Sequence, residues 1–476
     1  MDQASHAQAL TAAQQQGLLA ALRDAVGASA VLSGNAIPPR NEQDWSTLGP
    51  LRPLAVVRPV DTEGVANAMR ICAAFRVPVV PQGGLTGLCG GARPVDGAVA
   101  LSLERMTGID ELDAASATLT VKAGTPLQTV QQAADEAGFF FPLDLGSRGS
   151  CAIGGNLSTN AGGNRVIRYG MAREMVLGLE AVLADGTVVT NLNKMLKNNA
   201  GYDLKHLFIG SEGTLGIITR VVLRLSPKPG CTMAALCALD SYAQLVSLLG
   251  AARRGLGPLL SAFEVMWPDY WRTVTNRVPG VQDPLGGAAD HACYALIEAQ
   301  GMDEALDAPR FEQWLETQME QGVIANAALA QSLADVHAFW AVRDACAEFP
   351  QVLGPHESFD IGLPVAVMDD YVSACRDALQ ARLPGAVALF YGHIGDGNLH
   401  IVACVPGRSP QPKEAIAETV YTLVQRFGGT ISAEHGIGVT KKAWLPFTRS
   451  DAELALMRRL KDALDPQHLL NPGKVM

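Results

Sequence analysis

The pattern of hydrophobic and polar residues changes character near residue 230. Before it, short runs rich in β-branched residues alternate with amphipathic segments and glycine-rich stretches. The pattern predicts strands at 54–57, 77–80, 98–102, 118–123, 176–183 and 216–225, and helices at 62–75 and 127–137. Asp61 or Thr62 is the predicted N-cap of the first helix. Prolines at 227 and 229 then indicate a domain boundary.

Beyond this boundary, longer helical and strand-like segments alternate. The predicted helices are 242–253, 311–321 and 329–346, and the predicted strands are 231–239, 292–299, 387–391 and 399–405. The first 32 residues have the pattern of an amphipathic helix rich in alanine and glutamine. We therefore expect four parts, namely 1–45 (an N-terminal helical segment), 46–228, 229–430 and 431–476.

Composition and charge narrow the classes of function. A chain of 476 residues exceeds what one core usually holds, which agrees with several domains. The formal net charge of −10 argues against nucleic-acid binding, which needs a basic surface. No apolar run reaches the roughly 18 residues of a membrane span, and no secretion signal is evident, so we expect a cytoplasmic protein. The nine cysteines form no CxxC pair, which favours reduced, buried thiols.

Three glycine-rich stretches in the first half are the first candidate for a binding site. They span 81–91, 142–164 and 210–219, and we call them the three glycine loops. Glycine allows the close approach and the positive φ angles that let successive backbone N–H groups surround a diphosphate. None of the loops is a GxGxxG fingerprint or a P-loop. One such loop alone is as readily a structural turn, but three together favour a large polar cofactor.

A histidine-containing hairpin is the second candidate. The turn dipeptide Asp396-Gly397 lies between two β runs. If these two residues form the loop, His393 pairs with His400 on one face, with Cβ atoms about 5 Å apart. Two imidazoles at that separation can share one metal ion.

A second strand, expected to begin at Ile431, runs into a glycine turn at Glu434 and His435. A carboxylate with two histidines suits Zn²⁺ or Mn²⁺ and leaves positions for substrate oxygens. Each histidine alone is as readily an ordinary hydrogen-bonded residue. Three of the nine histidines within 43 residues, each beside a glycine turn, favour a catalytic cluster.

The glycine and histidine motifs together resemble a known family. PQGGLTGLCGG, IGGNLSTNAGG, GSEGTLGIIT, HIGDGNLH, SAEHGIG and LDPQHLLNPGK are similar to motifs of the vanillyl-alcohol-oxidase, or PCMH-type, flavoproteins. The similar branch contains the D-lactate, glycolate and D-2-hydroxyglutarate dehydrogenases, and the resemblance spans about residues 45–476. It implies an α+β fold with a two-part PCMH-type FAD-binding domain, a cap domain whose antiparallel sheet is covered by helices, and a C-terminal helical segment that returns to the FAD domain.

The resemblance implies FAD, with its diphosphate on the first two glycine loops. No histidine lies between residues 7 and 205, so we expect noncovalent binding. Relatives of the hydroxyglutarate type usually have asparagine where Leu85 stands. The expected FAD contacts are Gln82, Gly83, Gly84, Leu85, Thr86, Gly87, Pro142, Gly146, Ser147, Gly154, Gly155, Asn156, Thr159, Asn160, Gly162, Gly213, Gly216, Ile218 and Asn471.

The resemblance also implies roles in the second half. His393, His400 and Glu434 would hold the metal, with His435 as the base. A metal lowers the pKa of a bound hydroxyl, a neutral histidine can take its proton near pH 7, and FAD N5 accepts the hydride. We expect Arg343, Asn398 and His435 to contact the substrate.

The nature of the acid is predicted from the residues near Arg343, whose planar fork suits a carboxylate. Ala347, Ser358 and Val402 stand where hydroxyglutarate-oxidising relatives have polar groups. A second buried carboxylate without partners is costly, so we expect a less polar D-2-hydroxy acid, such as lactate or a longer or aromatic homologue. His356 could replace the missing cation, which keeps D-2-hydroxyglutarate as an alternative.

Two further readings stay open from the sequence. One is an O₂-using oxidase on the same scaffold, because access of oxygen to a flavin is not visible in a sequence. The other is a noncatalytic flavin-binding subunit for electron transfer, against which the His393, His400, Glu434 and His435 set argues. The resemblance suggests a quinone or an electron-transferring flavoprotein as electron acceptor. A homodimer is left open.

Overall fold

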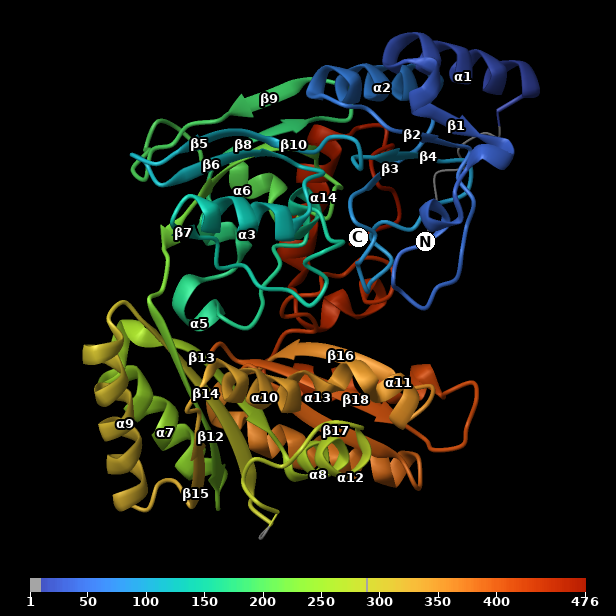
Figure 1. Cartoon of the computed structure of the whole chain (residues 1–476). Coiled ribbons are helices and arrows are strands. Elements are labelled where there is room, and N and C mark those ends of the chain that lie inside the picture. Colours follow the sequence, from blue (N-terminus) through green and yellow to red (C-terminus); the bar gives the residue numbers. More distant parts are fainter. Residues whose placement is uncertain (1–9, 288–289) are drawn as a thin grey trace. The chain divides into compact units, whose positions relative to one another are not determined.

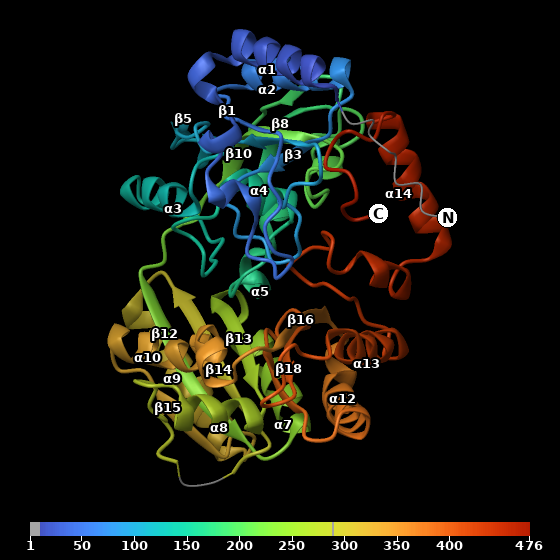
Figure 2. The same ribbon diagram turned by 90° about the vertical axis from the view of Figure 1, so that its right-hand side faces the viewer.

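A computed structural model describes residues 10–287 and 290–476 of the chain, shown from two sides in Figures 1 and 2. It forms two compact units. Of the described residues, the first contains 10–163, 170–227 and 434–476. The second contains residues 164–169 and 228–433. The expected N-terminal helix is α1 (Ala12–Val26), which belongs to the first unit, while residues 1–9 of that prediction lie outside the described residues.

The first unit is built on two main sheets. One has the order β1-β2-β4-β3, in which β2, β4 and β3 are parallel and β1 is antiparallel to β2. Its strands are β1 (Val31–Ser33), β2 (Ala55–Val57), β3 (Val79–Gln82) and β4 (Val99–Ser102). The other is antiparallel, with the order β5-β6-β10-β8-β9. Its strands are β5 (Ile109–Asp113), β6 (Thr118–Lys122), β8 (Val176–Val182), β9 (Val188–Asn191) and β10 (Ile217–Arg224). A short pair joins β7 (Phe139–Phe140) to β11 (Ser226–Pro227).

Helices pack beside these sheets. They are α2 (Thr62–Phe75), α3 (Leu127–Glu136), α4 (Ile153–Ser158), α6 (Lys205–Phe208) and α14 (Asp451–Leu464), with 3₁₀ turns η1 (Ala28–Ala30), η2 (Gly34–Ala36), η3 (Pro39–Glu42), η4 (Ala172–Met175) and η8 (Lys442–Phe447). The predicted limits of α2 are confirmed, and so is its cap, because Asp61 accepts a hydrogen bond from Gly64 N. The cap satisfies one of the free N–H groups of the first turn. Val65, Met69 and Cys72 bury one face of this helix, as the 3.6-residue period predicts.

The second unit has a seven-stranded antiparallel sheet with the order β15-β12-β14-β13-β17-β18-β16. Its strands are β12 (Cys231–Leu239), β13 (Leu260–Met266), β14 (Cys293–Gly301), β15 (Asn326–Leu329), β16 (Glu357–Gly362), β17 (Val387–Gly392) and β18 (Asn398–Cys404). Its helices are α5 (Val166–Tyr169), α7 (Tyr242–Gly255), α8 (Pro268–Arg277), α9 (Glu304–Glu320), α10 (Leu333–Asp344), α11 (Phe349–Val352), α12 (Met368–Arg382) and α13 (Lys413–Arg426), with 3₁₀ turns η5 (Gly257–Leu259), η6 (Ala345–Glu348) and η7 (Val365–Val367).

One face of this sheet carries a hydrophobic core of the second unit. Tyr270 of α8 and Phe339 of α10 pack there against Leu296 of β14 and Val402 of β18. The residues of β12 from 233 to 239 are all buried, so both faces of this strand are covered. Burial on both faces agrees with a sheet that is covered by helices on both sides. Together with the mixed sheets of the first unit, this confirms the predicted α+β fold.

Residues 164–169 leave the first unit and pack with the second. Arg165 Nε donates to the buried carboxylate of Glu298 (2.9 Å), and Arg168 Nη1 donates to the carbonyl of Gln300 (2.6 Å). The segment is flanked by Gly163 (φ 127°) and Gly170 (φ 76°), two backbone conformations that favour glycine. Arg165 and Arg168, which follow the second glycine loop in sequence, are therefore tied to strand β14.

Two predictions about the whole chain can be compared with the structure. Among the residues described, every helix is too short or too polar to cross a membrane. All nine cysteines are free thiols, and seven of them are buried.

Candidate functional site

The first two glycine loops lie against each other in the first unit. A Cβ on Gly84 would fall on the carbonyl oxygen of Ser150 and 2.6 Å from Cys151 Cα, so only glycine fits there. A Cβ on Gly83 would lie 3.4 Å from Ala152 Cβ. The loop after β3 is thereby fixed directly beside the start of α4.

The third glycine loop and the C-terminal segment join the same region. Asn471 Nδ2 donates to the carbonyls of Gly91 (3.1 Å) and Glu212 (2.7 Å). Glu212 accepts hydrogen bonds from Ile437 N (2.6 Å) and Gly438 N (2.8 Å). Loops from three parts of the sequence and the chain end therefore meet around one centre within the first unit.

Some of the predicted FAD contacts face open space or lack partners. A Cβ on Gly155 or Gly146 would meet no atom within 4 Å. Asn156 Oδ1 and Asn471 Oδ1 are buried and have no hydrogen-bond partner among the described residues. A buried polar atom without a partner is costly, and a bound polar group would remove that cost. These positions fit FAD.

Other predicted contacts serve the protein's own packing. A Cβ on Gly154 would lie 2.6 Å from Ala123 Cβ, and one on Gly216 would lie 2.7 Å from the Phe208 ring. Ile218 is buried in β10, and Thr159 Oγ1 donates to the Gly155 carbonyl of its own helix (3.3 Å). At these positions a contact with FAD stays a prediction.

The remaining positions of this set lie in or beside the loops. Leu85 is buried at φ 64° and Asn160 lies at φ 50°, a region that asparagine tolerates better than leucine. Gln82 is buried, and its Nε2 donates to the Ala92 carbonyl (3.0 Å), so it holds the first loop closed. A contact with FAD also stays a prediction at Thr86, Gly87, Pro142, Ser147, Gly162 and Gly213.

The predicted register of the histidine hairpin was wrong. His400 pairs with Tyr391, whereas the two-residue loop predicted a pair with His393. The reason is a longer turn: Asp396 N (3.2 Å) and Asn398 N (3.1 Å) both donate to the His393 carbonyl, so His393 lies outside the ladder. The two histidine rings are still close, with centroids 5.3 Å apart.

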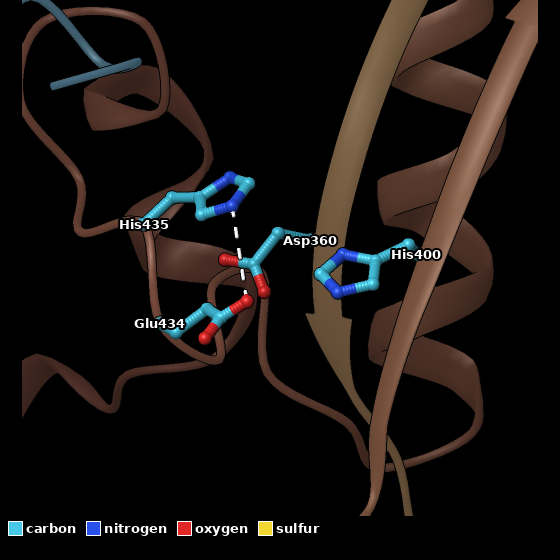
Figure 3. Close-up of side chains that lie close together, drawn as sticks. All are labelled: Asp360, His400, Glu434 and His435. Carbon is cyan, nitrogen blue, oxygen red and sulfur yellow. Dashed lines mark ion pairs between the residues drawn. The ribbon is translucent and has the colours of Figure 1, made fainter. Parts of the chain in front are cut away.

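A cluster of four possible metal ligands surrounds His400. Ligand atoms of Asp360, His400, Glu434 and His435 all lie within 4.8 Å of one another, and Figure 3 shows their side chains turned toward a common point. We call these four residues the carboxylate–histidine cluster. Two imidazoles and two carboxylates form a donor set that suits Zn²⁺ or Mn²⁺. His400 and Glu434 of the predicted metal set are in this cluster, whereas the metal role of His393 stays a prediction.

Asp360 was not among the predicted ligands. It is the cross-strand partner of His400 on β16, so the two side chains share a face of the sheet. Its Oδ2 accepts from Ser432 Oγ (3.1 Å) and Ala433 N (3.2 Å). These bonds hold the chain directly before Glu434, where a turn replaces the predicted strand. In the sequence, Asp360 is visible only as an aspartate between two apolar residues. Its closeness to His400 follows from the pairing of β16 with β18.

Asn398, a predicted substrate contact, lies beside this cluster. Its Nδ2 donates to Asp360 Oδ1 (2.7 Å), which fixes the orientation of the amide. Its Oδ1 is buried and has no hydrogen-bond partner in the described part of the chain. The amide oxygen is therefore placed to accept a hydrogen bond from a ligand.

Arg343, the predicted carboxylate-binding residue, belongs to a buried triad with Glu264 and His393. Arg343 Nε donates to Glu264 Oε2 (2.8 Å), and His393 Nδ1 lies 2.8 Å from Glu264 Oε1. Burial opposes ionisation of Glu264, but the electrostatic interactions and hydrogen bonds with His393 and Arg343 outweigh it and hold the pKa of Glu264 below its usual value. Burial likewise opposes the charge of Arg343, but Glu264 keeps its pKa well above the usual value. The arginine is thus charged and held in place without a ligand.

Comparisons with known proteins agree with this architecture. A family model described as "FAD linked oxidases, C-terminal domain" matches residues 228–475, and one described as "FAD binding domain" matches residues 53–191. The chain is 40% identical over 438 residues to D-2-hydroxyglutarate dehydrogenase of Xanthomonas citri pv. viticola, covering 91% of each chain. It is 40% identical to mitochondrial D-2-hydroxyglutarate dehydrogenase of Arabidopsis thaliana, covering 88% of this chain and 74% of that protein.

A solved structure shows the same fold at low identity. A crystal structure of p-cresol methylhydroxylase with substrate bound superposes with a TM-score of 0.78 over 98% of this chain and 97% of that one, at 16% identity. The PCMH-type fold predicted from the motifs is therefore confirmed.

Proposed function

We propose that this chain, which belongs to the FAD-linked oxidases and is an FAD-dependent D-2-hydroxy-acid dehydrogenase, uses a divalent metal and acts on an acid less polar than 2-hydroxyglutarate. Its relatives named above are D-2-hydroxyglutarate dehydrogenases, and they support the class of reaction. The metal and the identity of the acid are argued from this chain's own residues.

The metal proposal rests on the carboxylate–histidine cluster. His400 and Glu434 would hold the ion, together with Asp360 or with His393, whose ring lies close to that of His400. A bound divalent ion lowers the pKa of a coordinated hydroxyl, and FAD supplies the hydride acceptor. Zn²⁺ suits the donor set best, with Mn²⁺ as the second candidate.

The chain's residues divide the remaining work. Arg343 would bind the substrate carboxylate through the guanidinium nitrogens that Glu264 does not use. Asn398 Oδ1 would accept a hydrogen bond from the 2-hydroxyl group, which removes the cost of its missing partner. His435, next to Glu434 in the cluster, would take the hydroxyl proton.

The observation that carries the choice of acid is the composition of one face of the sheet. On this face, the pair Asp360–His400 is followed two residues along by the pair Ser358–Val402, and Leu389 is the partner of Val402 on β17. Val402 and Leu389 are buried in the apolar core under α8 and α10. The side chains next to the cluster in this row are therefore apolar, and a second carboxylate beside Val402 and Leu389 would find no polar partner on either of them.

The experiment is a substrate panel on the FAD-loaded protein with an artificial electron acceptor. We expect kcat/KM for D-lactate or D-phenyllactate to exceed that for D-2-hydroxyglutarate, and L-isomers to be poor substrates. Val402→Asn should shift the ratio toward D-2-hydroxyglutarate, whereas Val387→Asn, on β17 outside the cluster, should not. A wild-type protein that strongly prefers D-2-hydroxyglutarate would refute the proposed acid and favour a role for His356 as the missing cation.

The electron acceptor and assembly are further parts of the proposal. A quinone or an electron-transferring flavoprotein would reoxidise the flavin, and the cytoplasm is the proposed location. Rapid reoxidation of the reduced protein by air would favour an oxidase instead. Sedimentation of the purified protein distinguishes a homodimer from a monomer.

A further inference from the structure

Glu264 is a buried glutamate whose two oxygens hold two different functional residues. It lies in the middle of β13 and has no exposed surface. Oε2 accepts from Arg343 Nε (2.8 Å), and Oε1 lies 2.8 Å from His393 Nδ1. Its cross-strand partner on β14 is Leu296, so its side chain points to the face that α10 covers. No motif in the sequence marked this residue.

The contact with His393 determines which ring nitrogen carries the proton. A carboxylate only accepts hydrogen bonds, so Nδ1 must donate to Glu264. A neutral ring then has its lone pair on Nε2, the nitrogen that lies 3.0 Å from Arg343 Nη2. Histidines that ligate metals usually donate their other nitrogen to a carboxylate or carbonyl, which fixes ring and tautomer. Glu264 supplies that partner.

The contact with Arg343 determines which part of the guanidinium stays available. Nε is committed to Glu264. Nη2 also lies 3.0 Å from His393 Nε2, and Nη1 lies 3.5 Å from Asp344 Oδ1, so each terminal nitrogen keeps one further N–H for a two-point contact with a carboxylate. Tyr391 lies under the guanidinium, with 5.4 Å from Cζ to the ring centroid, and further restricts the plane of the group.

We propose that Glu264 is a positioning residue that sets both the metal affinity of His393 and the orientation of Arg343 toward the substrate carboxylate. The inference rests on the proposed function, in which His393 is near the metal and Arg343 binds the acid. It predicts that one substitution, remote from the flavin loops in sequence, weakens metal and substrate binding together.

The test compares Glu264→Gln with a matched control in the full-length, FAD-loaded protein. Gln places an amide against His393 Nδ1, which favours the tautomer with the proton on Nε2. Glu298→Gln is the control, because Glu298 is equally buried, lies on the same face of the sheet and also binds an arginine, Arg165. Competition with a chromophoric chelator gives the Kd for Zn²⁺, and initial rates give kcat and KM for D-lactate.

We expect Glu264→Gln to raise the Zn²⁺ Kd by about 10–100-fold, as other changes to the partner of a metal-binding histidine do. KM should also rise, measured at saturating Zn²⁺. Glu298→Gln should leave the Zn²⁺ Kd unchanged, and the flavin spectrum should be that of the wild type in both variants. Glu264→Asp, which keeps the carboxylate, should have a Zn²⁺ Kd between those of the wild type and Glu264→Gln.

The outcomes separate this inference from the proposed function. A wild-type protein that binds Zn²⁺ while Glu264→Gln has the same Zn²⁺ Kd and KM overturns the role of Glu264 alone. Equal losses in Glu264→Gln and Glu298→Gln also overturn it, because they reflect general damage to the sheet. A wild-type protein without Zn²⁺ affinity overturns the metal proposal and this inference together. If Glu264→Gln does not fold, the order of Kd values for the wild type and Glu264→Asp decides.

Discussion

The glycine loops of the first unit and the polar side chains near His400 and Arg343 are two sites made in opposite ways. The loops are shaped by backbone: Gly84 leaves room for the Ser150 carbonyl, and Asn471 holds two loop carbonyls. The second unit instead uses charged side chains that fix one another, as Glu264 does with Arg343 and His393. A backbone site depends on missing side chains, whereas a side-chain site depends on the register of strands. We therefore expect added side chains to damage the loop site and removed side chains to damage the other site.

We expect the largest effect from a substitution in the carboxylate–histidine cluster, and we expect it on catalysis. His435→Ala should lower kcat by about 10²–10⁴-fold, the usual contribution of a general base, with the flavin still bound. Steady-state rates and the flavin absorbance spectrum measure the two effects. His291→Ala, a histidine on the second unit that pairs with Asp240, is the control and should keep full activity. If His435→Ala loses its flavin, the expected difference between the two sites is refuted.

In the glycine loops, we expect stability and FAD binding to fall when a methyl group is added, because a glycine has no side chain to remove. Gly84→Ala places a Cβ on the Ser150 carbonyl, so we expect a loss of stability at or above the roughly 1–3 kcal/mol typical of overpacking, together with loss of FAD. Thermal unfolding and the flavin content of the purified protein measure both.

The matched variant is Gly155→Ala, whose new Cβ would meet no protein atom within 4 Å. It should fold normally and bind FAD more weakly, because its methyl group enters the space assigned to the cofactor. If Gly155→Ala binds FAD as tightly as the wild type, FAD does not occupy that space.

Two buried cations, one in each unit, allow a further comparison of the two units. Arg343 is paired with Glu264 in the second unit, whereas Lys474 in the first unit donates to the Arg93 carbonyl (2.8 Å). Burial lowers the pKa of Lys474 to about 8, with Asp44 partly opposing this effect. Since an unfolded lysine has a pKa of about 10.4, the unfolded state binds more protons between these values, and stability should rise with pH there.

Lys474→Met should remove this dependence on pH. The variant should gain up to about 3 kcal/mol over the wild type at pH 7, less the lost hydrogen bond, and the difference should shrink as the pH rises above 8. Denaturant unfolding at pH 7 and pH 9 measures it. Parallel pH dependences for the two proteins would show that Lys474 stays fully charged in the folded state.

The sequence was informative about the first unit because its signals are local. The glycines of each loop are close together in sequence, and the limits of α2 follow from its cap and its 3.6-residue period. The packing of Gly154 against Ala123 was not visible, because nothing in a glycine indicates whether a cofactor or the protein fills the space beside it.

The second unit was harder to predict because its site depends on pairing between distant strands. The Asp396-Gly397 dipeptide correctly indicated a turn, but the His393 carbonyl accepts two hydrogen bonds across it and shifts the ladder, so Tyr391 is opposite His400. Asp360 joins the cluster through β16, and Glu264 reaches His393 through β13. Neither contact has a sequence signal, since each joins residues that lie at least 40 positions apart.

Anaerobic reduction of the bound flavin tests the central claim most directly. The account predicts that D-lactate bleaches the oxidised flavin of the metal-loaded protein, that L-lactate does not, and that removal of the metal with EDTA stops the reaction while FAD stays bound. Added Zn²⁺ or Mn²⁺ should restore it. Equal rates of flavin reduction by D-lactate with and without the metal would contradict the account.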